Sequence, residues 1–578
     1  MINLIINNIP VSVPADYTVL QAAQSINIKI PTLCHLDLHD IKMVNQVASC
    51  RVCMVEIENR RNLAPACATM VTEGMVVTTD SLRVIQARRV VVELLLSDHP
   101  ADCLICERNR DCDLQTLAAE LGIREIKYQG EMSSYNPDVS SYSIVRNLDK
   151  CIMCRRCETM CNDVQTVGVY SAIDRGFEAV VAPAFDLPLI NTACTFCGQC
   201  VSVCPTAALT EVNNVRNVWD AIYDEDKFVI VQTAPAVRVA IGEEFGMEPG
   251  TRVTGKMVSA LRRLGFDKVF DTDFAADLTI MEEASELVHR LESGGRLPIL
   301  TSCCPAWVKF FEHQFPDLLD IPSTCKSPHE MFGAIAKSYL AEKMGIDPEK
   351  MVVVSVMPCL AKKYEAARPE LAEHENPNVD IVISTREFAQ MIKETGMDFV
   401  NLPDDDFDKP LGESSGASVI FGTTGGVIEA ALRTAYEWIT GTELEDVDFK
   451  ELRGMEGIRE AVIPIKDMDM KIAVAHGLGN ARKLLEDIRD GKENYDAIEI
   501  MACPGGCIGG GGQPYHHGDI ELLKKRSAAI YEEDKGKAIR KSHENPEIIK
   551  LYEEFLGEPY GEKAHELLHT TYTPREMI

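Results

Sequence analysis

The chain has 578 residues, a formal net charge of −31 and an isoelectric point near 4.9. This length exceeds what a single hydrophobic core normally supports, so several domains are expected. The acidic balance repels phosphate backbones and anionic lipids, which excludes nucleic-acid binding and membrane-surface binding as functions.

Cysteine usage and the first residues predict a cytoplasmic protein. The sequence contains 21 cysteines, many at C-x-x-C spacing, which favours thiolates on metal over disulfides. Residues 1–7 lack the cationic and long apolar segments of a secretion signal. No stretch reaches the roughly 18 apolar residues that a membrane-spanning helix needs, so no membrane partner is expected.

The first 80 residues predict a small ferredoxin-like sheet domain. Residues 2–14 alternate in polarity around Asn7 and Asn8, which predicts a hairpin, and Thr18 is expected to cap a short helix over 19–23. Short strands are expected at 54–57 and 76–78. The cysteines of this segment are Cys34, Cys50, Cys53 and Cys67. Their spacing, C-x15-C-x2-C-x13-C, differs from that of plant-type ferredoxins. The spacing alone therefore allows either a zinc site or an iron–sulfur cluster.

A second cysteine set follows a predicted helix over residues 84–96. Its candidate ligands are His99, Cys103, Cys106 and Cys112. One imidazole and three thiolates can hold zinc or an iron–sulfur cluster, and the residues alone leave both open.

An internal repeat comes next. The run C-x2-C-x2-C-x3-C begins at Cys151 and again at Cys194, which is typical of bacterial two-cluster ferredoxins. In that fold the fourth cysteine of each run binds the other cluster. The predicted ligand sets are therefore Cys151, Cys154, Cys157 and Cys204, and Cys194, Cys197, Cys200 and Cys161.

From about residue 216 the chain alternates predicted strands and helices, which indicates an α/β region of two or more lobes. The predicted strands cover residues 228–231, 351–356, 419–421 and 472–475, and a helix is predicted over 427–439. Cys359 directly follows one of these strands, where reactive loops of such sheets gather.

Three segments in this region combine cysteines with other reactive side chains. They are Thr301-Ser302-Cys303-Cys304-Pro305, then Met357-Pro358-Cys359 with Lys362 and Glu365, then Met501-Ala502-Cys503 with Cys507. Four thiolates from three separate loops suit a buried iron–sulfur cluster, whereas a zinc ribbon takes two local pairs. The additional thiol, lysine and methionines indicate a reaction site rather than a simple electron carrier.

Two glycine patterns do not predict a nucleotide site. Gly477-Leu478-Gly479 lacks the rest of a dinucleotide fingerprint, and the run 509–512 lacks the Gly-Lys-Ser/Thr ending of a phosphate loop. We expect this run to allow close approach of the backbone to a cofactor.

The segments TSCCP, MPCxxKxxE and ExMxCxxGCxxGGGQP resemble the three signatures of the iron-only, or [FeFe], hydrogenases. The amino-terminal cysteine sets resemble the accessory-cluster domains of longer members, and Cys34 to Cys112 also resemble the large iron–sulfur subunit of respiratory complex I. The resemblance implies a β-grasp [2Fe–2S] ferredoxin domain (1–80) and a small helical [4Fe–4S] domain (81–145) whose cluster is bound by one histidine and three cysteines. A bacterial-type two-[4Fe–4S] ferredoxin domain (146–215) and a two-lobed α/β catalytic domain (216–578), with its H-cluster between the lobes, would follow.

The resemblance also implies the cofactors and their surroundings. One [2Fe–2S] cluster and three accessory [4Fe–4S] clusters, one of them ligated by His99, would precede the H-cluster. Cys304, Cys359 and Cys503 would hold its [4Fe–4S] cubane, and Cys507 would bridge the cubane to a diiron subcluster carrying CO, cyanide and a dithiolate. Lys362 would donate to a buried cyanide, since a buried acceptor needs a donor. The expected packing residues are Ala234, Pro235, Met357, Phe421, Gly422 and Met501.

By the same resemblance, protons would travel from Cys303 through a water to Glu283, Ser323, Glu286 and Arg290. Glu283 and Glu286 are three residues apart and so lie on one face of a helix. Without the resemblance this pair would be interpreted as a solvated acidic surface. Cys325 is expected to be a small buried side chain.

We therefore predict the catalytic subunit of an [FeFe] hydrogenase, H2 ⇌ 2 H⁺ + 2 e⁻. Its expected partners are a flavin-containing NAD(P)-linked subunit, a small iron–sulfur subunit and ferredoxin, because the chain has no nucleotide motif of its own. The alternatives are a single-chain ferredoxin-dependent hydrogenase, a hydrogenase-like sensor or iron–sulfur assembly protein, and a pure electron-transfer subunit.

Overall fold

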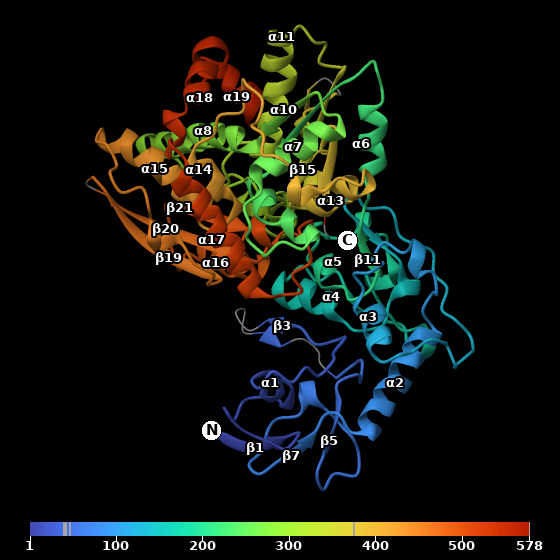
Figure 1. Cartoon of the computed structure of the whole chain (residues 1–578). Coiled ribbons are helices and arrows are strands. Elements are labelled where there is room, and N and C mark those ends of the chain that lie inside the picture. The colour runs from blue at the N-terminus through green and yellow to red at the C-terminus, as the bar shows by residue number, and fades with distance from the viewer. Residues whose placement is uncertain (39–42, 45–47, 374–375, 467, 577–578) are drawn as a thin grey trace.

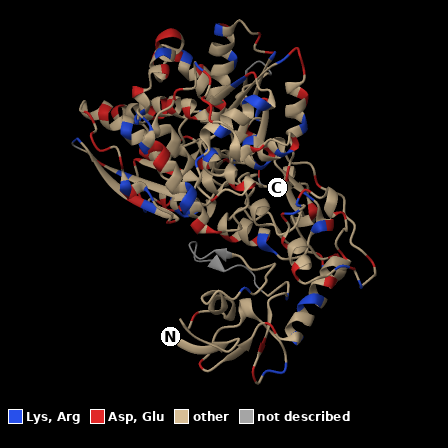
Figure 2. Cartoon of the chain, viewed as in Figure 1, with Lys and Arg blue, Asp and Glu red and all other residues tan. Residues whose placement is uncertain are grey.

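A computed structural model describes residues 1–38, 43–44, 48–373, 376–466 and 468–576. Figure 1 shows the amino-terminal sheet domain at one end, the cysteine-rich segments in the middle and the large α/β region at the other end. Acidic residues lie among basic ones over all of these parts (Figure 2). Among the described residues, no helix is both long and apolar enough to cross a membrane.

The amino-terminal domain is a mixed sheet with strand order β2-β1-β7-β5-β6, in which β1 and β7 are parallel. The predicted hairpin is present, with Asn7 and Asn8 in the left-handed region that a two-residue turn requires. Thr18 caps α1 through a capping box with Gln21. The elements are β1 (Ile2–Ile6), β2 (Ile9–Val13), α1 (Val19–Gln24), β3 (Asp37–Leu38), β4 (Met43–Val44), β5 (Met54–Ile57), β6 (Ala64–Pro65) and β7 (Val76–Thr78).

Helices α2 (Leu82–Ser97) and α3 (Asp113–Glu120) connect this sheet to the repeat region, where β8 (Ile144–Arg146) pairs with β11 (Leu209–Glu211) and β9 (Ser171–Ile173) with β10 (Val180–Ala182). The two copies of the repeat have matching backbones. Met153 and Arg155 in the first copy, and Phe196 and Gly198 in the second, all have positive φ. Short helices α4 (Arg156–Thr159) and α5 (Gln199–Val203) follow. The repeated loop therefore turns in the same way around each cysteine set.

Two four-stranded sheets form the α/β region. The first is entirely parallel, with order β13-β12-β15-β18, and the second has order β14-β21-β20-β19, with only β19 antiparallel. Their strands are β12 (Phe228–Thr233), β13 (Lys268–Asp271), β14 (Ile299–Leu300), β15 (Met351–Met357), β18 (Ile381–Ser384), β19 (Ile458–Ile465), β20 (Met468–His476) and β21 (Ala497–Met501). A small hairpin pairs β16 (Ala372–Glu373) with β17 (Asn376–Pro377).

Helices cover both sheets. They are α6 (Val215–Ile222), α7 (Thr254–Leu264), α8 (Thr272–Ser293), α9 (Pro305–Gln314), α10 (Pro328–Ile335), α11 (Ala341–Met344), α12 (Ala361–Glu365), α13 (Thr385–Glu394), α14 (Gly416–Val419), α15 (Gly426–Thr440), α16 (Leu478–Arg489), α17 (Ile520–Gly536), α18 (Pro546–Leu551) and α19 (Glu562–Leu568). Helix α8 joins the two lobes, because Phe274 and Leu278 pack in the core of the first sheet and Ala284 and Leu287 in that of the second.

The predicted strand at 419–421 is wrong. Residues Gly416–Val419 form α14 and Ile420–Gly422 a 3-10 turn, capped by Ser415, whose hydroxyl accepts from the Ser418 amide. Asp277 in turn accepts from the Ser415 amide at 2.8 Å. The periodicity of a short apolar run does not distinguish a buried helix from a strand. Here the Ser415 cap favours the helix.

The repeat region docks on the cysteine loops of the α/β region by backbone contact. Gln165 donates to the Ala502 carbonyl and Gln199 to the Gly509 carbonyl, each at 2.9 Å. A Cβ on Gly511 would lie 2.6 Å from the Cys197 carbonyl oxygen and 2.7 Å from the Gly198 Cα. Only glycine allows this approach.

We therefore predict that Gly511→Ala destabilises the docked domain by about 1–3 kcal/mol, as overpacking typically does. Scanning calorimetry of the anaerobically purified protein should show a lower melting temperature. Gly536→Ala is the matched control, since a Cβ there meets nothing within 4 Å. Equal melting temperatures for wild type and Gly511→Ala would contradict the tight contact.

Candidate active site

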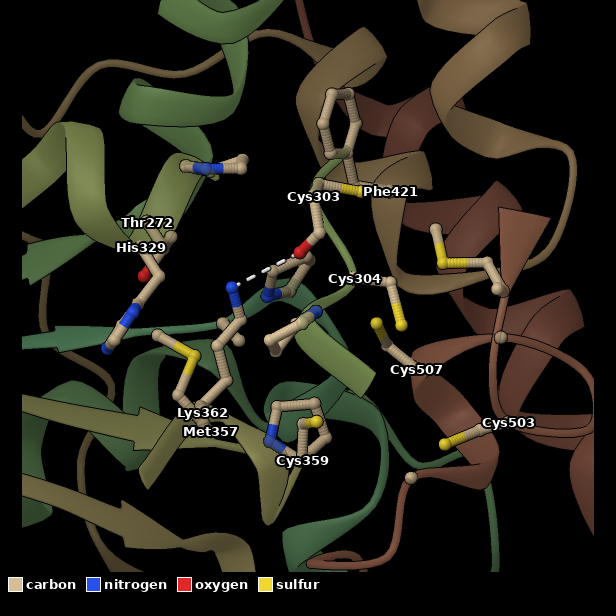
Figure 3. Close-up of a pocket in the computed structure, with 18 of the residues that line it drawn as sticks. Thr272, Cys303, Cys304, His329, Met357, Cys359, Lys362, Phe421, Cys503 and Cys507 are labelled. Atoms are coloured by element: carbon tan, nitrogen blue, oxygen red, sulfur yellow. Dashed lines mark hydrogen bonds between the residues drawn. The ribbon is translucent and has the colours of Figure 1, made fainter. Parts of the chain in front are cut away.

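The three reactive segments converge because each follows a strand end. Cys303 and Cys304 follow β14, Cys359 follows β15, and Cys503 and Cys507 follow β21. All five line one cavity. Figure 3 shows the thiols of Cys304 and Cys507 close together, with Lys362 and Met357 across from them. Loops from both sheets thus meet at carboxyl strand ends, where α/β proteins place their sites.

Most of the expected packing residues line the same cavity. They are Ala234, Pro235, Met357, Phe421 and Met501. Gly422 instead lies behind this wall, where an added Cβ would be 3.1 Å from Ile530 Cδ1 and 3.4 Å from the Ala236 nitrogen. The lining is predominantly apolar, so charges that enter the cavity face a dry environment.

Lys362 is the cation at the cavity, and its ammonium is held by three acceptors. It donates to Glu365 at 2.7 Å, to Ser327 Oγ at 2.8 Å and to the Cys303 carbonyl at 3.2 Å. Burial opposes the charge, but the Glu365 carboxylate raises the pKa of Lys362 above its ordinary value. The lysine is therefore a charged, preorganised donor.

His329 was not predicted as a site residue, and Glu365 was noted in the second cysteine segment without a role. His329 lines the cavity, and its Nδ1 lies 3.1 Å from Glu365 Oε2. Its Nε2 is buried without a hydrogen-bond partner in the part of the chain that the structure describes. The i,i+3 spacing of Lys362 and Glu365 on α12 was an available signal. No motif in the neighbouring sequence identifies His329, which lies on α10.

The buried thiols fit a metal group. Burial raises the pKa values of Cys304, Cys359, Cys503 and Cys507 above the ordinary thiol value, so bare thiolates there would be costly. A bound cationic metal removes that cost. Four soft ligands in one dry cavity therefore fit an iron–sulfur group.

Glycines near Cys507 bring the loops together. Gly506 has φ +90°, and a Cβ there would lie 2.7 Å from the Thr424 nitrogen. Gly510 lines the cavity and packs on the Pro358 carbonyl. Of the run 509–512, Gly510 lines the cavity, whereas Gly509, Gly511 and Gly512 pack on protein backbone, Gly511 on that of Cys197 and Gly198.

Three of the predicted relay residues, Glu283, Glu286 and Arg290, follow one another on α8, whereas Ser323 lies in the loop before α10. Ser323 Oγ donates to Glu286 Oε2 at 2.9 Å, and Arg290 pairs with Glu286 Oε1 at 2.5 Å. Burial, and then Glu286, raise the pKa of Glu283 to about 8, while Ser302 and Ser323 interact with its carboxyl. Burial and Glu283 raise the pKa of the Cys303 thiol far above its ordinary value. Glu283, Glu286 and Ser323 are buried, whereas the side chain of Arg290 is 12% exposed.

Two further residues near Glu286 were not predicted. The Thr324 amide donates to Glu286 Oε2 at 3.0 Å, and His569 Nδ1 lies 2.7 Å from Thr324 Oγ1. The Cys325 thiol is buried 3.9 Å from the same oxygen. The short bonds from Ser323 and Thr324 fix the Glu286 carboxylate, and the longer thiol contact adds little.

The repeat cysteines surround two further cavities. One is lined by Cys151, Cys154, Cys157 and Cys204, and the other by Cys161, Cys194, Cys197 and Cys200. The structure thus brings together the same two sets that the spacing predicts.

The first two cysteine sets differ in exposure. Cys34, Cys50, Cys53 and Cys67 are all buried, and the Sγ atoms of Cys53 and Cys67 are 3.3 Å apart. In the second set Cys103 is exposed, whereas Cys106 accepts from Lys150 at 3.4 Å. His99 Nδ1 is buried without a hydrogen-bond partner among the described residues, which leaves it available to a metal.

Sequence profiles of known families match almost the whole chain. Residues 227–511 match "Iron only hydrogenase large subunit, C-terminal domain" and residues 520–575 match "Iron hydrogenase small subunit". Residues 1–81 match a 2Fe-2S iron-sulfur cluster binding domain, and residues 148–208 a 4Fe-4S dicluster domain. Residues 88–127 match "NADH-ubiquinone oxidoreductase-G iron-sulfur binding region".

Whole-length relatives agree with these profiles. The chain is 63% identical to the NADP-reducing hydrogenase subunit HndD of Solidesulfovibrio fructosivorans, with 100% of both chains covered. It is 38% identical to iron hydrogenase 1 of Clostridium pasteurianum, over 99% of this chain and 100% of that one. A solved variant of the [FeFe]-hydrogenase HydA1 of Chlamydomonas reinhardtii matches with a TM-score of 0.57 and 45% identity, over 63% of this chain and 100% of that one.

The raised pKa of Glu283 gives a prediction about stability and pH. Its ordinary value is 4.5 and its folded value about 8, so in this window the folded chain holds a proton that the unfolded chain has released. The free energy of unfolding should therefore fall as pH rises from about 4.5 to about 8. Glu283→Gln should remove that part of the slope, measured as the melting temperature at several pH values. Glu292→Gln, an exposed change on the same helix, is the control. An unchanged slope in Glu283→Gln would show that this carboxyl is ionised throughout.

Proposed function

Because this chain belongs to the iron-only hydrogenase family, we propose that its cysteine-lined cavity is where it interconverts H2 with protons and electrons. The chain is an iron hydrogenase, an oxidoreductase that contains iron–sulfur domains. The observation that carries the proposal is the convergence of Cys303, Lys362 and the cysteines of three loops on one buried cavity.

The residues present fit the H-cluster. Cys304, Cys359 and Cys503 would hold its cubane, and Cys507 would bridge to the diiron subcluster with CO, cyanide and a dithiolate. When bound, this group supplies the metal at which H2 is formed and split. Lys362, charged and held by Glu365 and Ser327, would donate its third N–H to a cyanide acceptor in place of the longer bond to the Cys303 carbonyl. Met357, Met501, Phe421, Ala234 and Pro235 exclude water.

Protons would move along side chains of this chain. The Cys303 thiol remains protonated because of its raised pKa, so it can hold a proton at Sγ facing the cavity. A water would connect it to Glu283, whose pKa near 8 lets it change protonation close to neutral pH. Ser323 passes the proton to Glu286, and Arg290 positions that carboxylate at the surface end.

The other cysteine sets would carry electrons. In this proposal Cys34, Cys50, Cys53 and Cys67 hold a [2Fe–2S] cluster. His99, Cys103, Cys106 and Cys112 hold the first [4Fe–4S] cluster, and the two repeat sets hold the others. The Gly511 contact supports the last step, since it brings the loop of Cys197 against the loop of Cys507.

We further propose that the chain works in a cytoplasmic complex with a flavin-containing NAD(P)-linked subunit, a small iron–sulfur subunit and ferredoxin. The support is the whole-length similarity to a subunit named as NADP-reducing. Nicotinamide nucleotides are cytoplasmic substrates, and the chain has no nucleotide motif itself.

Cys303→Ala tests the proton donor. Hydrogen evolution from reduced viologen should fall by about 10²–10⁴-fold, because a general acid is lost, while the iron content stays the same. Cys325→Ala is the matched control, since it also removes a buried thiol near the relay, and should retain most activity. Full activity in Cys303→Ala would mean that protons take another route.

The partner proposal is tested on protein purified from its own cells. Native mass spectrometry should show a complex with bound flavin, and H2 should reduce NAD or NADP. Ferredoxin required together with the nucleotide would indicate electron bifurcation. A monomer that reduces ferredoxin alone would refute the complex and support the single-chain alternative.

A further inference from the structure

Lys309 is a buried cation that the proposed reaction does not use. It lies on α9, the helix that begins directly after Cys304, and the residue is 5% exposed. Its ammonium faces two aromatic rings, 4.9 Å from the Phe196 centroid and 5.5 Å from that of Tyr364. Its hydrogen-bond partner is His313 Nε2, at 2.9 Å.

Among the described residues, no carboxylate forms an ion pair with this ammonium. The carboxylate nearest in sequence, Glu312, is already occupied by Arg368 at 2.7 Å and Arg575 at 2.5 Å. A buried ammonium without a counter-charge is expensive. Burial accordingly lowers the pKa of Lys309 to about 8 and, with Lys309, lowers that of His313 to about 4.

The negative charge that Lys309 lacks is available at the neighbouring cysteine set. Phe196, on which the ammonium rests, stands between Cys194 and Cys197 in the loop that surrounds the cavity of Cys161, Cys194, Cys197 and Cys200. The Cys194 thiolate is the strongest influence that favours the charged lysine. A cubane held by four thiolates is anionic and becomes more so on reduction.

We propose that Lys309 is the counter-cation of the cluster held by Cys161, Cys194, Cys197 and Cys200, raising its reduction potential and binding a proton as the cluster gains an electron. This inference rests on the proposed assignment of that cluster. Lys309 acts through space as a positioning charge, since an ammonium beside a cluster stabilises the more negative, reduced form.

The step balances in charge. Above about pH 8, where Lys309 is neutral beside the oxidised cluster, one proton from water would bind the Lys309 amine as one electron arrives from a neighbouring cluster. When the electron moves on, the N–H bond breaks and the proton returns to water. The other charged groups facing the lysine are Glu312, Arg368 and Arg575, which pair with one another, leaving the cluster charge as the variable one.

The test is a redox titration of the anaerobically purified, cluster-loaded full chain, monitored by electron paramagnetic resonance at several pH values. In wild type the potential of this cluster should fall as pH rises above about 8, where Lys309 loses its proton in the oxidised state. Lys309→Met should lower the potential at neutral pH by about 59 mV, a tenfold change in the ratio of reduced to oxidised cluster, and remove the pH dependence. Lys309→Arg should keep the high potential without the pH dependence, because a guanidinium does not deprotonate.

Lys343→Met is the matched control, since Lys343, on α11, is also a lysine over an aromatic ring, 4.5 Å from that of Tyr339. This variant should leave the potential unchanged. The inference would be overturned if Lys309→Met kept the wild-type potential and the wild-type dependence of the potential on pH. If Lys309→Met does not fold, a wild-type pH dependence in Lys309→Arg would overturn it instead. The Cys200→Ser variant should lose one cluster signal that wild type shows. If wild type and Cys200→Ser show the same cluster signals, the cluster assignment itself is wrong.

Discussion

Desolvation is the constraint on which the rest of this structure depends. The cavity between the two sheets is walled by apolar side chains, so each charge in or beside it requires a fixed partner. Lys362 has Glu365, Arg290 has Glu286, and Glu283 shares its surroundings with Glu286 and stays protonated to a higher pH. The same burial raises the pKa values of the thiols, which favours a metal group that takes them as thiolates.

Two lobes make this cavity possible. The carboxyl ends of β15 and β21 each contribute cysteines, and α8 packs on both sheets while carrying the acidic residues of the relay. In the proposed mechanism, electrons and protons would therefore move through different elements. The repeat region contacts the loop of Cys507 through Gly511, whereas Glu283, Glu286 and Arg290 lead away along α8.

Local signals in the sequence were sufficient for part of the account. The hairpin at Asn7 and Asn8, the Thr18 cap and the two repeat sets depend on neighbours in the chain or on fixed spacing, and all are present. The prediction of a strand at 419–421 was wrong because the residues that stabilise the observed helix, the Ser415 cap and Asp277, lie outside that run. His329 and Lys309 could not be predicted, since each gains its role from residues on distant elements.

The central claim is that the cavity of Cys304, Cys359, Cys503 and Cys507 carries the diiron chemistry. The most direct measurement compares hydrogen evolution and infrared spectra of the chain produced with and without hydrogenase maturation factors, because a polypeptide cannot make CO or cyanide itself. The matured protein should show bands of both ligands and evolve H2, whereas the other should retain its iron–sulfur clusters and be inert. Hydrogen evolution by protein reconstituted with iron and sulfide alone would contradict the assignment.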